Sequence, residues 1–132
     1  MENIGKSILK EAYSTSRKIY GTKLCNAYLY GSYARGDYDK DSDVDILLTV
    51  DMDNPEAGDY FYDIAKLSNK LSLDYDVTVS ICAKSSSQFQ KYLDILPFYS
   101  NVEKEGIKYV VWRKEKLIKN TLRTCYAMSK YS

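Results

Sequence analysis

The first half of the chain contains one amphipathic stretch and two dense apolar stretches. A helix ending near Gly21 is predicted by apolar residues at helical spacing, namely Ile4, Ile8, Ala12 and Ile19. Leu24 to Tyr30 then predicts a short strand that runs into Gly31. Val44 to Val50 predicts a second strand, and its nearly continuous apolarity indicates burial on both faces of a sheet.

The second half continues the alternation of helices and strands. Asn54-Pro55-Glu56 is typical of a helix start, and an apolar stripe follows it at Ala57, Tyr60, Phe61, Ile64, Leu67 and Leu71. The chain from Asp76 to Ile81 predicts a third strand. The serines at 85–87 can cap a helix that carries Phe89, Tyr92, Leu93 and Leu96 and is stopped by Pro97. A last strand from Ile107 to Trp112 and a terminal helix complete the prediction.

These elements predict a single α/β (α+β) domain over residues 1–132, a small mixed β-sheet with helices packed on it. Its core covers about residues 20–112, and a basic C-terminal helix covers about 114–129. The terminal helix can dock on this domain or on a partner, and its basic face can contact RNA, although a solvated surface helix is the simpler interpretation.

Composition limits the chemistry and the compartment. The chain has no histidine, which excludes a Ser-His or Cys-His nucleophile and a His-ligated zinc site. Three widely spaced cysteines favour reduced thiols in a cytoplasmic protein over a disulfide framework. No apolar stretch approaches the roughly 20 residues that span a bilayer, so no membrane association is expected.

Charge is distributed unevenly along the chain, although the net charge is only +1. The segment 37–63 has a single basic residue, Lys40, against Asp37, Asp39, Asp41, Asp43, Asp45, Asp51, Asp53, Glu56, Asp59 and Asp63. A solvated acidic loop accounts for the outer members of this set. It does not account for the two aspartates at the start of the second strand.

Asp43 and Asp45 form an Asp-x-Asp pair whose side chains project from the same face of a strand. Two carboxylates this close repel each other unless a divalent cation lies between them, and oxygen ligands suit magnesium. A site with two metal ions usually needs a third carboxylate from a neighbouring strand. Asp76 is the preferred candidate for that role, and Asp74 is the reserve.

Gly31 and Ser32 follow the first strand and predict a phosphate-holding turn. Glycine lets the backbone approach a ligand, and a short helix from Ser32 through Arg35 would offer amide donors to a phosphate. Arg35 either faces a triphosphate or pairs with a loop aspartate and braces the turn. Gly36 is expected to end the helix in a left-handed conformation, and Ser42 to fix the following loop.

The run Gly31-Ser32-Tyr33-Ala34-Arg35-Gly36, followed by Ser42-Asp43-Val44-Asp45, resembles the minimal nucleotidyltransferase (MNT) family of the polymerase-β-type superfamily. This resemblance extends over about residues 20 to 110 and implies the nucleotidyltransferase fold. It also implies that Asp43, Asp45 and Asp76 are the catalytic metal ligands, with Gly31 and Ser32 holding the triphosphate. Two magnesium ions are expected, with manganese as a substitute.

The same resemblance implies a reaction and a partner. The chain is expected to transfer AMP from ATP to a tyrosine of a HEPN-type toxin, which makes it the antitoxin of a toxin–antitoxin system. The acceptor site would be completed by that partner or by a second copy of this chain.

Three alternatives stay open or are weighed against this interpretation. A small-molecule transferase similar to the aminoglycoside-modifying enzymes is the main one, and a catalytically silent nucleotide or partner binder is the second. A calcium loop starting at Asp37 is disfavoured, because its sixth and twelfth positions hold Ser42 and Leu48 instead of glycine and glutamate.

Overall fold

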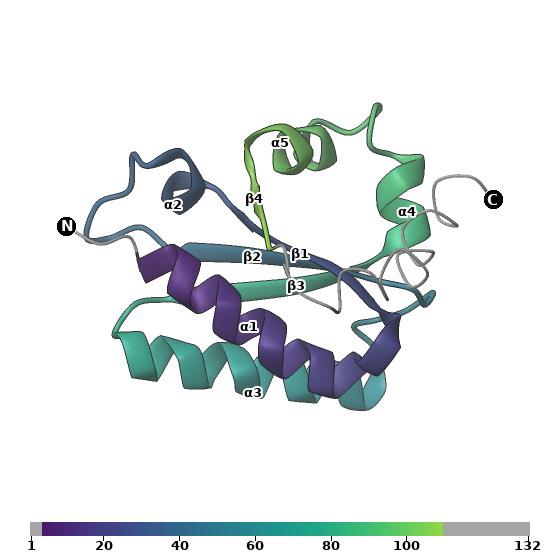
Figure 1. The fold of residues 1–132 in the computed structure, drawn as a ribbon, viewed down its shortest axis with the longest axis horizontal. Coiled ribbons are helices and arrows are strands. Elements are labelled where there is room, and N and C mark those ends of the chain that lie inside the picture. The colour runs from purple at the N-terminus through teal and green to yellow at the C-terminus, as the bar shows by residue number, and fades with distance from the viewer. Residues whose placement is uncertain (1–3, 110–132) are drawn as a thin grey trace, which may run out of the picture.

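The computed structural model of the chain describes residues 4–109, and they form a four-stranded sheet with helices on both faces (Figure 1). The predicted terminal helix and the end of the predicted last strand lie outside these residues. The elements in chain order are α1 (Ile4–Tyr20), η1 (Gly21–Lys23), β1 (Leu24–Tyr30), α2 (Ser32–Arg35), β2 (Val44–Val50), α3 (Gly58–Tyr75), β3 (Val79–Ser85), α4 (Ser86–Lys91), α5 (Pro97–Glu105) and β4 (Ile107–Lys108).

The sheet has the strand order β3-β2-β1-β4. β1 pairs antiparallel with β2 and with β4, whereas β2 and β3 pair in parallel. The central strands β1 and β2 have the bounds that the sequence predicts, and five of the seven residues of β1 and six of the seven of β2 are buried. The expected mixed sheet, and the burial of the second strand on both faces, are therefore confirmed.

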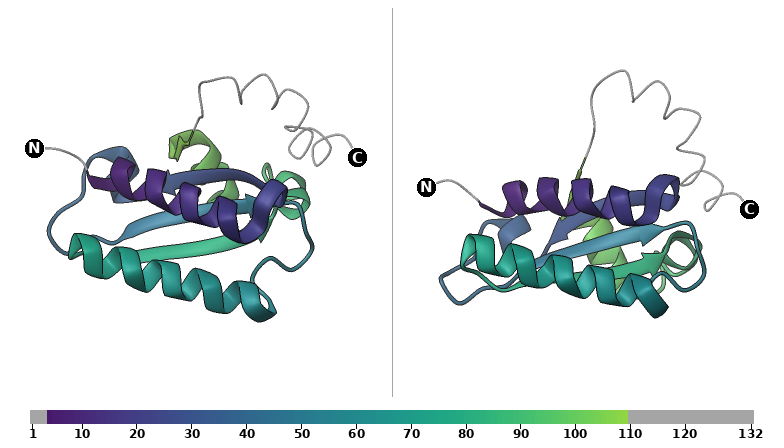
Figure 2. Two further views of the ribbon diagram at one scale, coloured as in Figure 1. Left: turned by 60° about the horizontal axis from the view of Figure 1, so that its bottom comes forward. Right: turned by 90° about the horizontal axis from the view of Figure 1, so that it is seen from below.

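Helices α1 and α3 lie side by side on one face of the sheet (Figure 2). β2 turns alternate residues towards them, and these residues form the larger core cluster together with Ile8 and Ala12 of α1 and Ile64, Leu67 and Leu71 of α3. The members from β2 are Val44, Ile46, Leu48 and Val50. The alternation of a strand thus gives the helices one complete apolar face to pack on.

Helices α4 and α5 cover the opposite face of the sheet (Figure 1). A smaller buried cluster holds them there, made of Tyr28, Leu47, Phe89, Tyr99 and Val102. Leu47 belongs to this cluster because it points away from Ile46 and Leu48 along the same strand. Asp45 shares its alternation, so it belongs to the α4–α5 face.

Several predicted boundaries were wrong. Asn54 to Ala57 forms a turn instead of the first turn of α3, because Gly58 has a φ of +58° and cannot continue a helix backwards. The third strand begins at Val79 rather than Asp76, because Asp76 ends α3 in a left-handed conformation. Pro97 stops no helix; it occupies the first turn of α5, a helix that the sequence analysis did not predict.

The stripe on α3 was correct in part. Ile64, Leu67 and Leu71 are buried, whereas Phe61 is 64% exposed. Tyr60, one residue earlier, packs on the core and stacks on Tyr20 with ring centroids 4.9 Å apart. The buried face of α3 therefore includes Tyr60, four residues before Ile64, and does not include Phe61, three residues before it.

Two expectations about compartment can be compared with the described residues. Cys82 is a free thiol, which agrees with the expectation of reduced cysteines at this position. None of the helices within residues 4–109 is long and apolar enough to cross a membrane.

Candidate functional site

The turn after β1 has the conformation that the sequence predicts. Gly31 has φ +78° and ψ −157°, a backbone region that is accessible to glycine alone. Its carbonyl oxygen accepts hydrogen bonds from the amides of Ala34 (3.0 Å) and Arg35 (3.1 Å), which close the short helix α2. Gly36 ends that helix with a φ of +91°, in the expected left-handed conformation.

The carboxylate pair stands at the beginning of β2. Asp43 precedes the strand and is exposed, whereas Asp45 is its second residue and is half-buried. Burial, and then the charge of Asp43, raise the pKa of the Asp45 carboxyl above its ordinary value. No ion pair among the described residues includes either carboxylate. Two like charges, one of them desolvated and neither compensated, fit the binding of a divalent cation.

The turn and the carboxylates meet directly. A Cβ atom added to Gly31 would lie 2.7 Å from Oδ2 of Asp45, closer than any real Cβ contact. The antiparallel pairing of β1 with β2 causes this approach, because Tyr30 is opposite Asp45 and Gly31 comes next. Gly31 therefore brings a potential phosphate-binding backbone against the carboxylate that would hold the cation.

The third carboxylate is not assembled in the same way. No group of three acidic or cysteine side chains able to hold a metal exists in the part of the chain that the structure describes. Asp76 is exposed and caps the end of α3, and it shares with Asp43 the wall of an open depression of about 430 Å³. Asp74 pairs with Lys70 at 2.7 Å on the surface of α3. The residue paired with Asp45 on β3 is Ser80, which supplies no carboxylate.

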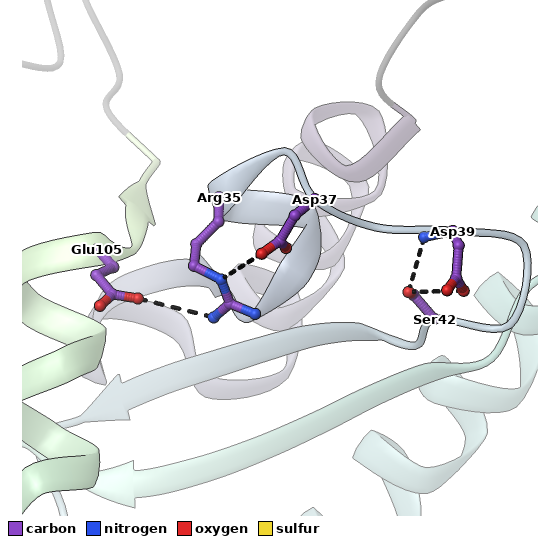
Figure 3. Close-up of polar contacts among 5 residues, drawn as sticks. All are labelled: Arg35, Asp37, Asp39, Ser42 and Glu105. Atoms are coloured by element: carbon purple, nitrogen blue, oxygen red, sulfur yellow. Dashed lines mark hydrogen bonds and ion pairs between the residues drawn. The ribbon is translucent and has the colours of Figure 1, made fainter.

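Arg35 and Ser42 have structural contacts in this site (Figure 3). Nε of Arg35 donates to Asp37 at 3.2 Å, and Nη1 lies 3.7 Å from Glu105 at the end of α5. Arg35 therefore makes the pairing with a loop aspartate that one of its two alternatives expected. Ser42 accepts from the amide of Asp39 at 2.9 Å, so it fixes the loop, as expected.

Two residues beside the carboxylates were missed by the sequence analysis. Tyr30 pairs across the strands with Asp45, and burial, then Cys82 and Asp45, raise the pKa of its phenol. Cys82 lies on β3, where burial raises the pKa of its thiol. Tyr30 directly precedes the Gly-Ser turn, so its position could have been inferred from sequence. The place of Cys82 depends on the register between β2 and β3.

Comparisons with known proteins agree with this geometry. A model described as the nucleotidyltransferase domain matches residues 16–122 of the chain. A protein of Methanocaldococcus jannaschii named "Putative protein adenylyltransferase MJ0604" is 37% identical over 98 residues, which are 74% of this chain and 90% of that protein. A second one from the same organism, "Putative protein adenylyltransferase MJ0141", is 41% identical over 73 residues, or 55% of this chain and 72% of that protein.

Similarity to solved structures is weaker. One of them is a tri-AMPylated HEPN toxin of Shewanella oneidensis in complex with its MNT antitoxin. A chain of it is 17% identical, with a TM-score of 0.46 over 96% of this chain and 87% of the other. A crystal structure described as a toxin-antitoxin with AMP-PNP has a chain that is 19% identical, with a TM-score of 0.47 over 90% of this chain and 87% of the other. Similarity at this level does not by itself indicate what this chain binds.

Proposed function

This chain belongs to the nucleotidyltransferase domain family, and we propose that it transfers AMP from ATP to a hydroxyl group of a protein. The observation that carries the proposal is the close approach of the Gly31 backbone to the Asp45 carboxylate. A Cβ atom added to Gly31 would lie 2.7 Å from Oδ2 of Asp45. It unites a backbone suited to phosphate with a carboxylate pair suited to a divalent cation. Neither feature alone would distinguish a nucleotidyl transferase from an ordinary turn or an acidic loop.

The residues have separate roles in the proposed reaction. Asp43 and Asp45 would hold magnesium, which when bound would neutralise charge on the phosphates and lower the pKa of the acceptor hydroxyl. The amides of the turn at Gly31 and Ser32 hold the triphosphate. The acceptor hydroxyl gives its proton to solvent water, and its oxygen bonds to the α-phosphorus. The bond from that phosphorus to the bridging oxygen breaks, and pyrophosphate leaves.

A tyrosine of a HEPN-type partner is the acceptor that we propose, with this chain acting as an antitoxin in the cytoplasm. The support is the resemblance of residues 31–45 to the MNT family and the identity of 37% to a relative named as a protein adenylyltransferase. A small-molecule acceptor and a silent binder are the competing outcomes of the test.

The test uses ATP labelled at the α-phosphate, magnesium and the HEPN-type partner protein, followed by gel autoradiography. We expect a labelled partner band that disappears in the D43N/D45N double variant. Asp41→Asn is the matched control, because Asp41 is an exposed acidic residue of the same loop and should retain labelling. Pyrophosphate release that depends on an added small molecule, without a protein label, would support the alternative transferase instead.

The role of Asp76 is tested in the same assay. We propose that the metal depends on Asp43 and Asp45 among the described carboxylates, since Asp76 is not grouped with them. Asp76→Asn should therefore reduce labelling much less than Asp43→Asn does. A loss of labelling equal to that of Asp43→Asn would instead identify Asp76 as the third ligand.

A further inference from the structure

Arg35 joins three segments that are separate in the sequence. Its own helix α2 follows the Gly31 turn, Asp37 lies in the acidic loop, and Glu105 ends α5. The guanidinium lies between the two carboxylates, 3.2 Å from Asp37 and 3.7 Å from Glu105 (Figure 3). Its planar fork suits two acceptors at once, which a lysine ammonium on its flexible stem does not match.

The chain that follows Glu105 packs against β1. The next residue, Gly106, donates its amide to Val102 at 2.9 Å, and a Cβ there would lie 2.4 Å from the Val102 oxygen and 3.2 Å from the Leu29 oxygen. Ile107 then pairs with Leu29 in the sheet. The corner between α5 and β4 is therefore packed against the backbone of β1, two residues before the Gly31 turn.

Helix α2 has little stability of its own, because a single turn of four residues pays the cost of helix nucleation for few hydrogen bonds. Contacts outside the helix must hold it. Tyr33 provides one of them: its buried ring stacks on Tyr38 with centroids 4.1 Å apart. Arg35 provides another, at the opposite end of the helix from Gly31.

We propose that Arg35 is a positioning residue that ties the phosphate-binding turn to the α5–β4 corner through Glu105, and that it is not a ligand of the triphosphate. This inference rests on the proposed function for the identity of the turn's ligand. The guanidinium of Arg35 already pairs with two carboxylates of the same chain, so its positive charge is largely compensated before any nucleotide binds. Its effect on ATP is exerted through the placement of the Gly31 and Ser32 backbone.

The first measurement needs no nucleotide. Amide hydrogen exchange over residues 31–36 is compared between the wild type, Arg35→Ala and Glu105→Ala. We expect faster exchange in both variants, because each frees α2 from the corner. Lys70→Ala is the matched control, since it removes an exposed ion pair with Asp74 on α3 and should leave residues 31–36 unchanged. Unchanged exchange in both Arg35→Ala and Glu105→Ala would overturn the inference.

The second measurement is the affinity for ATP with magnesium, by calorimetry, in a double-mutant cycle. Each single variant should weaken binding by about two- to fivefold, as expected for a half-exposed ion pair. The double variant should lose no more affinity than the more damaging of the two single variants, because both act through one contact. Arg35→Lys should not restore the affinity. A large loss in Arg35→Ala that Arg35→Lys rescues, with Glu105→Ala unaffected, would show a direct contact with the triphosphate.

The two measurements separate the inference from the proposed function. A wild-type protein that binds no ATP would contradict the proposed function, whereas the exchange data would still decide whether Arg35 and Glu105 position the turn.

Discussion

At the scale of single residues, Gly31 has two separate reasons to be glycine. Its φ of +78° with ψ of −157° is a conformation that other residues avoid, and the Asp45 carboxylate occupies the place of a side chain. Gly21 has the first property alone, because its φ is +64° and nothing lies within 4 Å of an added Cβ. Substitutions at Gly31 and Gly21 therefore separate the effect of backbone strain from the effect of contact with the Asp45 carboxylate.

Gly31→Ala should lower the free energy of unfolding by about 1–3 kcal/mol through backbone strain. It should also reduce nucleotidyl transfer on the order of 100-fold, because the clash displaces Asp45 from its place beside the turn. Urea denaturation and the labelling assay measure the two effects. Gly21→Ala should have the strain alone and keep the transfer activity; equal losses of activity in both variants would contradict the role of the contact.

Asp45 is expected to lower the stability of the metal-free protein at neutral pH, although the proposed transfer reaction needs it. Burial and Asp43 raise its pKa, so the folded protein holds this proton more tightly than the unfolded chain does. The carboxyl therefore stabilises the fold below the ordinary aspartate pKa, and this contribution is lost as the pH rises through the raised pKa. Asp45→Asn should raise the melting temperature of the metal-free protein at neutral pH and abolish transfer.

The measurement is thermal denaturation with a chelator between about pH 4 and pH 7, where an aspartate of ordinary pKa becomes ionised. The advantage of Asp45→Asn should shrink as the pH falls. Magnesium should raise the melting temperature of the wild type and not that of the variant. Asp41→Asn, in the exposed loop, should differ little from the wild type throughout.

At the scale of elements, the sequence predicted the cap of α4 correctly, but it misplaced the start of α3 and the role of Pro97. Ser85 caps α4, as the serine cluster suggests: its hydroxyl accepts from the amide of Gln88 at 3.3 Å. Capping is local chemistry and therefore visible in the sequence. Pro97 was misinterpreted because a proline fits the first turn of a helix as well as the end of one.

Ser85→Ala should destabilise the protein by about 1 kcal/mol, since one amide of α4 loses its acceptor. Chemical denaturation measures the change. Ser80→Ala, at an exposed position of the neighbouring strand β3, is the control and should change stability by less than about 0.5 kcal/mol. Equal effects of the two substitutions would argue against a contribution from the cap.

At the scale of the whole molecule, the sheet separates two apolar clusters, and β2 contributes to both. Leu47 is completely buried under α4 and α5, two residues after Asp45. Leu73 on α3 is 84% exposed, so the same residue type stands in two opposite environments. The residues that follow Asp45 therefore pack into both clusters, Ile46 into the larger one and Leu47 into the smaller one.

Leu47→Ala should lower the free energy of unfolding by about 2–5 kcal/mol, because it leaves a cavity beneath the helices of the site face. Leu73→Ala should change it by less than about 0.5 kcal/mol. Urea denaturation of both variants checks this difference. A small loss in Leu47→Ala would mean that the smaller cluster contributes little to holding the site.

The sequence by itself determined the parts of this protein that depend on neighbouring residues. The bounds of β1 and β2, the short helix after Gly31 and the left-handed Gly36 all follow from local propensity. The motif built from these parts also indicated the family to which the chain belongs.

Only the tertiary structure decided which distant residues meet. The parallel register places Ser80, not a carboxylate, next to Asp45, and the left-handed turn at Asp76 keeps that residue out of β3. The contacts of Arg35 with Glu105 and of Gly31 with Asp45 likewise depend on the packing of α5 and on the pairing of β1 with β2. Register and packing are set by the summed burial of the whole core, which no local pattern contains.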